Sequence, residues 1–393
     1  MDIYKINHIF LNQNKTQFCI CTNKGINTFS AQTFSQLDSS NSNEITLGEI
    51  SIANLLYELN IIVFVGSENN EEYNNKKLVF YDLVNKKEIY STFFISPIID
   101  IKSILKYVFV ISNKELVVYS YANLNEINLI SSIPFLNEKN FGCVIWNKKE
   151  NDNLNEKIYI AMYEKKEKDV SIISYFSKNY FYKQQSKTIN SPFSKIQNMF
   201  YIEELDQLFL VDGTGSYISS FDIETNKLIY NLYRGKNPGE IISMCKFSKN
   251  HLAVVNKNKT IHIFDLKDTN GYNITNILYK MISSIIYSSM KIRLKNVFQE
   301  FENSFFNLYY NKYGCFIYNL GDSNHIYVIG YNGVGLIIKI NFLKNDYVIV
   351  NQTRFFQKNS LTMGQSIDIN ENDVVISSIY ESKNIESNKW DII

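Results

Sequence analysis

The sequence is poor in arginine and nearly balanced in charge. Only three of its 40 lysine and arginine residues are arginine, and the formal net charge is +1. No broad basic field is therefore available to hold nucleic acid, and any anion site must be local. The five cysteines are scattered, odd in number and without a CxxC pair. We expect free thiols in a reducing cytosol.

Long hydrophobic segments are also missing. The longest apolar runs, NIIVFVG and KYVFVIS, have the length of a strand and are too short to span a bilayer. The N-terminal MDIYKINHIF lacks the basic start and apolar run of a signal peptide. We therefore expect a protein that is soluble or peripherally bound to a membrane.

Catalytic and metal-binding motifs do not occur in the sequence. The four histidines are dispersed without metal-ligand spacing, and neither GxSxG nor a P-loop is present. The glycine-rich GYNGVG at residues 330–335 has no helix after it to present a phosphate site, so we interpret it as a hairpin turn. We expect no enzyme activity, no cofactor and no bound metal.

Strand-like runs are what the sequence has in abundance. Its 27 Phe and 28 Tyr favour β structure, and pairs of such runs, separated by polar turns, recur about every forty residues. A β-sandwich would not show that period seven times. We predict an all-β chain, a single seven-bladed β-propeller over residues 1–393. Its units lie at residues 17–31, 76–94, 114–133, about 139–187, 207–233, 251–266 and 325–342.

One segment breaks this pattern, between two strands of blade six. Apolar residues at 274–290 follow the i, i+3, i+4, i+7 spacing of an amphipathic helix, within a loop over residues 268–296. The apolar face consists of Ile274, Ile277, Leu278, Met281, Ile282, Ile285 and Ile286. The basic residues on and beside the helix are Lys280, Lys291, Arg293 and Lys295.

A known family shares the pattern at residues 232–266, LYRGKNPGEIISMCKFSKNHLAVVNKNKTIHIFDL. This stretch resembles the signature of the PROPPINs, the WIPI-type β-propellers: Phe/Leu-Arg-Arg-Gly, a strand ending in Phe-Ser, then Leu-Ala and Thr-Ile-His-Ile-Phe. The runs FLNQNKTQFCICTNKGINTF, KKLVFYDL and ELVVYSYANLNEINLISSI resemble the family's first three blades. The resemblance therefore extends over most of the chain.

The resemblance implies a membrane-recruited adaptor of autophagy and of endolysosomal or vacuolar traffic. Such proteins bind phosphatidylinositol 3-phosphate (PI3P) and phosphatidylinositol 3,5-bisphosphate (PI(3,5)P2) in two rim pockets, one for each arginine of the motif. A loop of blade six enters the bilayer, and the rim of blades two and three recruits the autophagic lipid-transfer protein or another effector. We expect a cytoplasmic monomer, peripherally recruited to autophagosomal, endosomal or vacuolar membranes.

Arg234 is the main candidate for a lipid-binding residue. A planar guanidinium donates two parallel bonds to one phosphate and stays charged, whereas lysine supplies only a point charge. Thr260 and His262 face one side of a strand, where each can donate to a phosphate. The second pocket would comprise Arg234, Gly235, Asn256, Thr260 and His262, with Asn256 near the position of a family serine. The alternatives are an arginine in a surface turn and a His–Thr pair that caps a blade edge.

The first pocket departs from the family pattern. Tyr233 stands where the family has its first arginine, and Asp212 stands in place of a serine, where a carboxylate would repel phosphate. Ser216 still fits. A neutral hydrogen bond contributes about 1 kcal/mol, against roughly 1.5–3 kcal/mol for one to a charged group. We expect one competent pocket, around Arg234; the alternative is a protein-interaction scaffold that has lost lipid binding.

The predicted helix would supply a second membrane signal. Complete burial of an isoleucine contributes about 1.5–3 kcal/mol, and a basic residue at an anionic leaflet adds about 1 kcal/mol. One headgroup pocket and one inserted helix would together give reversible binding. The alternative is a helix that packs on the propeller rim and never meets lipid.

Overall fold

The chain folds into short antiparallel strands, as its β-branched and aromatic runs predict. The computed structural model describes residues 4–37, 47–56, 60–123, 126–134, 141–149, 156–164, 169–176, 183–267, 285–294, 315–321 and 323–356. Strands in these ranges form seven sheets, and the one helical element with described bounds is a 3-10 turn, η1 (Glu203–Leu205). No helix in the described ranges is long and apolar enough to cross a membrane.

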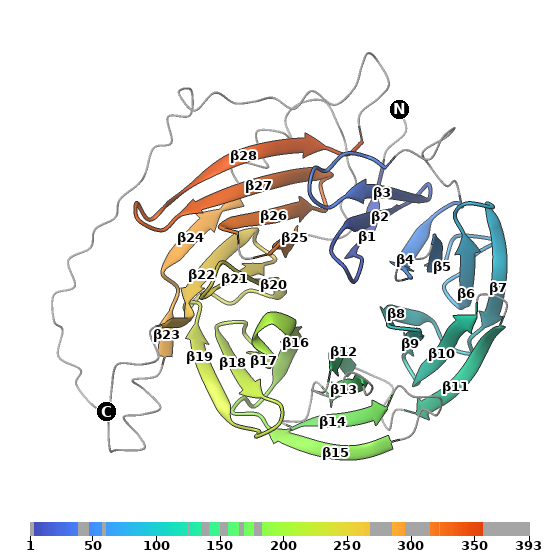
Figure 1. Cartoon of the computed structure of the whole chain (residues 1–393), viewed down its shortest axis with the longest axis horizontal. Coiled ribbons are helices and arrows are strands. Elements are labelled where there is room, and N and C mark those ends of the chain that lie inside the picture. Colours follow the sequence, from blue (N-terminus) through green and yellow to red (C-terminus); the bar gives the residue numbers. More distant parts are fainter. Residues whose placement is uncertain are drawn as a thin grey trace, which may run out of the picture.

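Each sheet is one blade of a ring, numbered along the chain (Figure 1). Blade one contains β1 (Ile6–Leu11), β2 (Gln17–Thr22) and β3 (Ile26–Ser30). Blade two contains β4 (Ile50–Leu55), β5 (Ile61–Gly66), β6 (Lys77–Asp82) and β7 (Lys87–Phe93). Blade three contains β8 (Ile98–Ile104), β9 (Tyr107–Ser112), β10 (Glu115–Asn123) and β11 (Glu126–Pro134). Blade four contains β12 (Phe141–Lys149), β13 (Glu156–Glu164), β14 (Asp169–Phe176) and β15 (Lys183–Asn190).

The remaining three blades include one strand that joins a blade out of chain order. Blade five contains β16 (Ile196–Ile202), β17 (Gln207–Asp212), β18 (Tyr217–Asp222), β19 (Leu228–Tyr233) and β23 (Ile285–Tyr287). Blade six contains β20 (Ile241–Phe247), β21 (His251–Asn256), β22 (Thr260–Asp265) and β24 (Met290–Arg293). Blade seven contains β25 (Cys315–Tyr318), β26 (His325–Gly330), β27 (Val334–Asn341) and β28 (Asp346–Arg354). The prediction of a seven-bladed β-propeller is confirmed.

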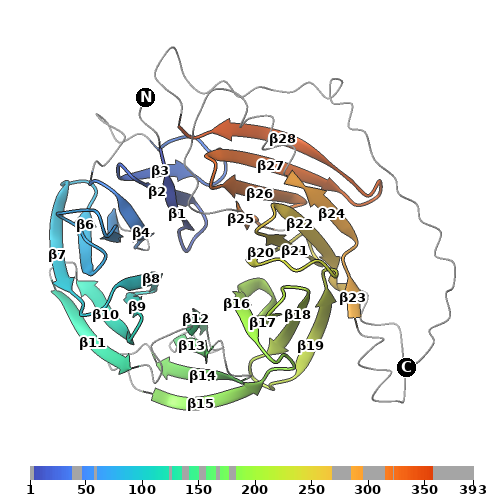
Figure 2. The same cartoon turned by 180° about the vertical axis from the view of Figure 1, so that it is seen from behind.

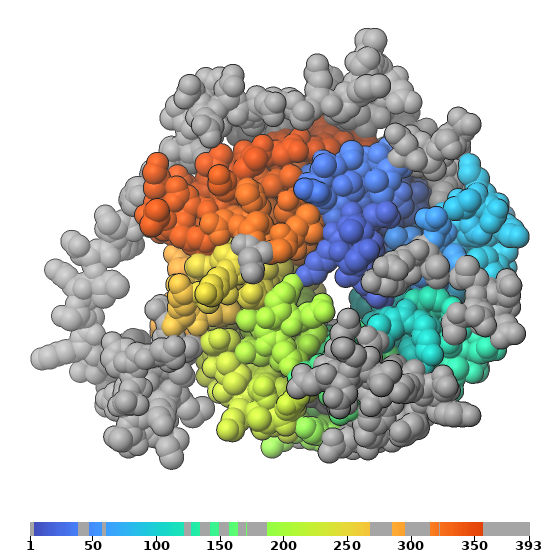
Figure 3. Space-filling model, viewed as in Figure 1, coloured from blue at the N-terminus to red at the C-terminus, as the bar shows by residue number. Residues whose placement is uncertain are grey.

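Clusters of buried apolar side chains hold the ring together, one between each pair of neighbouring blades. The cluster between blades one and seven closes the circle, with the rings of Phe29 and Phe355 4.9 Å apart. Tyr318 of blade seven also donates to the carbonyl of Ala31 at 2.7 Å. Figure 2 shows the closed circle from behind, and Figure 3 shows a narrow opening at its centre.

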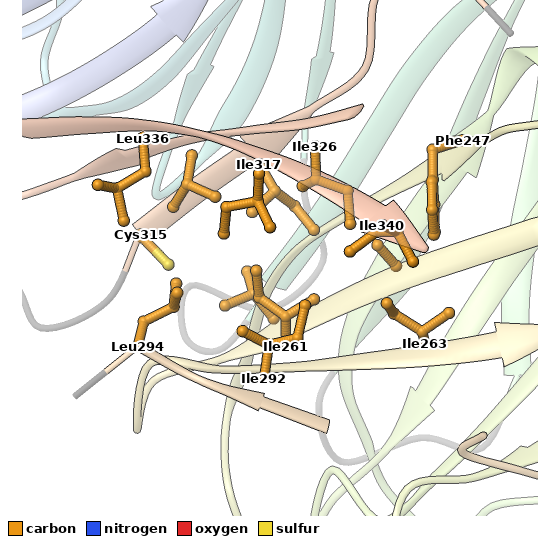
Figure 4. Packing of buried hydrophobic residues seen from close by; sticks show 14 of the residues in the cluster. Phe247, Ile261, Ile263, Ile292, Leu294, Cys315, Ile317, Ile326, Leu336 and Ile340 are labelled. Carbon is orange, nitrogen blue, oxygen red and sulfur yellow. The ribbon is translucent and has the colours of Figure 1, made fainter. Parts of the chain in front are cut away.

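The cluster between blades six and seven fixes which way the side chains of β22 point. Ile261 and Ile263 lie in this cluster together with Ile292 of β24 (Figure 4). Because side chains alternate along a strand, His262 points to the opposite face, toward blade five. Phe264 follows the same alternation and packs in the cluster between blades five and six.

The prediction of an amphipathic helix is wrong for its last residues, from Ile285 to Met290. Residues 274–284 lie outside the described ranges, but residues 285–287 form β23 and residues 290–293 form β24. β23 pairs in parallel with β19, and Ile286 is 7% exposed in the cluster between blades five and six. Ile286 therefore stabilises the propeller and is not available to enter a bilayer. Strand pairing and burial override the helical period of these last residues.

Candidate functional site

Arg234 follows the last residue of β19, where blade five meets blade six. Its side chain is 4% exposed. Its Nε donates to the Gly215 carbonyl at 2.6 Å, and its Nη2 donates to the Asn237 carbonyl. A guanidinium has five N–H donors, so three remain, and none of these makes a hydrogen bond in the described part of the chain. The two backbone carbonyls fix the plane of the group and leave its other edge for a ligand.

Arg234 has no carboxylate partner among the ion pairs of the described residues. Burial lowers the pKa of Arg234, and the nearby Asp212 opposes this shift. The Asp212 carboxylate instead accepts from Thr214 and from the backbone of Tyr217 within its own hairpin. Buried charges in proteins are normally paired. A guanidinium in this position therefore suits an anionic ligand.

Glycines allow the turn after Arg234 to take its shape. Gly235 has a φ of +134°, a conformation open almost only to glycine. Gly215 has a φ of +71°, and a Cβ there would lie 2.0 Å from the Gly239 carbonyl. The hairpin after β17 and the turn after β19 therefore touch through their backbones. This close approach brings the Gly215 carbonyl to Arg234, a contact that the sequence pattern did not reveal.

His262 and Asn256 lie beside Arg234, on blade six. Both are buried, with exposed fractions of 4% and 3%, and Gly239 adjoins both Arg234 and Asn256. Asn256 Oδ1 accepts from the backbone of Thr260 at 3.1 Å, which orients the amide across the turn between β21 and β22. The Nδ1 of His262 has no hydrogen-bond partner among the described residues. The structure therefore brings together the residues predicted for the second pocket.

Electrostatics keep His262 neutral in the free protein. Burial, the charge of Arg234 and the charge of Lys291 together lower the pKa of His262 from its usual 6.5 to about 3. The pairing of β22 with β24 places Lys291 directly opposite His262. A neutral imidazole still donates one hydrogen bond, so His262 can contact a phosphate without being charged.

The residues predicted for the first pocket lie on blade five close to Arg234, and their described contacts are with other protein groups. The Tyr233 ring lies 4.8 Å from that of Tyr217 and 5.5 Å from that of Tyr287, in a row across β18, β19 and β23. Ser216 is buried, and its carbonyl accepts from the backbone of Arg234 at 2.8 Å. Aromatic contacts thus replace the cation that the family pattern places here.

Only some of the residues predicted to insert into a membrane lie within the described ranges. Ile274, Ile277, Leu278, Met281 and Ile282 lie outside the described residues, as do Lys280 and Lys295. Ile285 is half-buried and pairs with Asn231. Lys291 and Arg293 lie on β24 and are exposed. The described part of the segment is therefore a pair of strands that connects blades five and six.

Comparison of the sequence with protein-family models and with curated proteins gave no match. Solved structures are similar. Hsv2 from Kluyveromyces marxianus matches with a TM-score of 0.62 at 16% identity, over 90% of this chain and 100% of Hsv2. Hsv2 from Kluyveromyces lactis matches with a TM-score of 0.65 at 14% identity, over 90% and 99%. KlAtg21, in its complex with the coiled coil of AgAtg16, matches with a TM-score of 0.62 at 19% identity, over 90% and 100%.

This chain has the PROPPIN fold. The expectation that its sequence raised is thereby confirmed for the architecture. In this PROPPIN fold β22 ends at Asp265, and the chain re-enters the described sheets through β23 on blade five and β24 on blade six.

Proposed function

We propose that this protein is a phosphoinositide effector that binds PI3P, PI(3,5)P2 or both through one pocket around Arg234. The observation that carries the proposal is the buried guanidinium of Arg234, held by two backbone carbonyls and without a carboxylate partner in the described part of the chain. Asn256, Thr260 and His262 supply neutral donors beside it. A buried guanidinium whose orientation is fixed can donate two parallel hydrogen bonds to one phosphate.

A membrane role follows from the same site. β24 carries the exposed Lys291 and Arg293 and pairs with β22, the strand of Thr260 and His262. The Arg234 pocket would recruit the protein from the cytoplasm to autophagosomal, endosomal or vacuolar membranes that carry 3-phosphorylated lipid. Residues 274–282 would add apolar contact with the bilayer, and binding would be reversible. The protein would then act as an adaptor in autophagy or in endolysosomal traffic.

Vesicle flotation tests this function. Vesicles of phosphatidylcholine with PI3P or PI(3,5)P2 should float the wild-type protein, and phosphatidylcholine alone should not. Arg234→Met removes the charge-assisted hydrogen bonds, worth about 1.5–3 kcal/mol each, and should lower binding at least tenfold. Arg354→Met on β28 of blade seven is a matched control and should bind as wild type does. Equal binding by Arg234→Met and wild type would refute the proposal.

The rim of blades two and three is our proposed effector surface. Phe93, at the end of β7 in blade two, is 69% exposed, and Ile95, just after it, is 84% exposed. Leu129 on the outer strand of blade three is 61% exposed. Exposed apolar patches of this kind mark interaction sites. An autophagic lipid-transfer protein, or a coiled coil of the kind bound by KlAtg21, would dock here. Phe93→Ser with Ile95→Ser should abolish effector binding and leave vesicle flotation unchanged.

A protein-interaction scaffold without lipid binding is the second candidate. The observation in its favour is the tyrosine row at the first-pocket position, where Tyr217 and Tyr287 are 43% and 64% exposed. Aromatic side chains are enriched in protein interfaces. Wild-type protein that fails to float with either phosphoinositide, yet still binds an effector, would favour this function.

A further inference from the structure

Two cations of the outer strand of blade six lie directly opposite the predicted pocket residues. β24 pairs with β22 in antiparallel register, so that Lys291 lies opposite His262 and Arg293 lies opposite Thr260. Directly opposed residues have Cβ atoms about 4.5–5.5 Å apart and share one face of the sheet. Lys291 and Arg293 therefore belong to the same face of blade six as His262 and Thr260.

That face is the one turned toward blade five and Arg234. Met290 and Ile292, which alternate with the two cations, pack in the cluster between blades six and seven. Alternation then places Lys291 and Arg293 on the opposite side. The pKa of His262 supports this placement, because Arg234 and Lys291 both lower it. Arg234, Lys291 and Arg293 thus surround the His262–Thr260 edge.

No acidic side chain forms an ion pair with any of these three cations in the described part of the chain, and the nearby Asp212 interacts with Arg234 only at longer range. Neither Lys291 nor Arg293 takes part in an ion pair between described residues, and both are exposed. The buried Nδ1 of His262 has no partner among the same residues. Like charges on one face of a sheet destabilise it. A cluster of this kind is typical of a site that binds a polyvalent anion.

We propose that Lys291 and Arg293 are headgroup-binding residues of the Arg234 pocket and select a phosphoinositide headgroup that carries a second phosphate monoester on its inositol ring, as PI(3,5)P2 does. One phosphate monoester carries about −1.5 to −2 charges and so offsets at most two of the three cations. A second phosphate offsets the third. This inference rests on the proposed function and replaces the role in general membrane attraction that the sequence suggested for these two residues.

Soluble headgroups separate the two roles, because no bilayer is present. Titration calorimetry would measure binding of the deacylated lipids, in which the 1-phosphate stays a diester: glycerophosphoinositol 3-phosphate, from PI3P, and glycerophosphoinositol 3,5-bisphosphate, from PI(3,5)P2. Wild-type protein should bind the 3,5-bisphosphate at least tenfold more tightly. Lys291→Met and Arg293→Met should each weaken binding of the 3,5-bisphosphate about tenfold and binding of the 3-phosphate less, since a hydrogen bond to a charged group contributes at least that factor. Lys339→Met, an exposed lysine of β27, should change neither.

The outcomes also distinguish this inference from the proposed function. If Lys291→Met and Arg293→Met bind both headgroups as wild type does, the inference is wrong and the Arg234 pocket still stands. The two residues would then act on the bilayer, and their loss would reduce flotation with any anionic lipid, including phosphatidylserine. If wild-type protein binds neither headgroup nor phosphoinositide vesicles, the proposed function fails, and the inference fails with it.

Discussion

The buried imidazole of His262 makes the stability of this propeller depend on pH. In the folded protein its pKa is lowered to about 3, by burial, by Arg234 and by Lys291. In the unfolded chain the imidazole titrates near its usual value of about 6.5. Between these two values the unfolded chain binds one proton more than the folded protein. The free energy of unfolding therefore falls as the pH falls below about 6.5.

The magnitude follows from the difference between the two pKa values. Each pH unit within this window corresponds to about 1.4 kcal/mol, so His262 lowers the free energy of unfolding by roughly 2 kcal/mol between neutral pH and pH 5. His262→Asn replaces the imidazole with a neutral polar group that does not titrate. The variant should lack this part of the pH dependence.

Urea unfolding at pH 7 and pH 5 measures the effect for both proteins. The difference between the two pH values should be about 2 kcal/mol larger for wild type than for His262→Asn. His251→Asn is a comparison variant: burial also lowers the pKa of His251, but Asp265 opposes this shift, so the variant should lose less of the pH dependence than His262→Asn does. Identical pH dependence in wild type and His262→Asn would refute the assignment of a buried, neutral imidazole between two cations. Bound phosphate should reduce the loss at pH 5, because an anion favours protonated His262.

Three further outcomes are expected. Gly235→Ala places a Cβ on a residue with a φ of +134°, which should lower the free energy of unfolding by about 1–3 kcal/mol. An unchanged urea midpoint would show that alanine is not strained at this position. Ile286→Asp buries a carboxylate in the cluster between blades five and six and should unfold the protein, which circular dichroism would detect. The double variant Ile282→Asp with Ile285→Asp should instead stay folded and be released from vesicles, which flotation would detect. Tyr233→Ala should change flotation less than twofold, and a loss as large as that of Arg234→Met would show that the first pocket is active.

Much of the fold could be predicted from the sequence. Strand-like runs with polar turns at a period of about forty residues predict a propeller, because each blade buries its faces only against its neighbours. The GYNGVG stretch is the turn between β26 and β27, as predicted. The cysteines of CICT, Cys19 and Cys21, lie in the core between blades one and two and form no disulfide. These features depend on local pattern and turn chemistry, which the sequence contains directly.

The candidate site could be predicted only in part. The motif at residues 232–266 indicated Arg234, Asn256, Thr260 and His262, and these residues meet where blade five contacts blade six. The carbonyls of Gly215 and Asn237 that hold Arg234 have no signal in the sequence, because any residue supplies a carbonyl. Burial and two nearby cations keep the ring of His262 neutral in the free protein, an effect of tertiary packing that the motif does not contain.

The sequence by itself determined the repeat, the turns and the arginine, because these follow from residue type and spacing along the chain. Only the tertiary structure decided that residues 285–293 are strands, since β23 and β24 form by pairing with β19 and β22, which lie far from them in the sequence. That pairing buries Ile286 and sets Lys291 opposite His262. Pairing register is a property of two segments together, so the helical period of one segment could not reveal it.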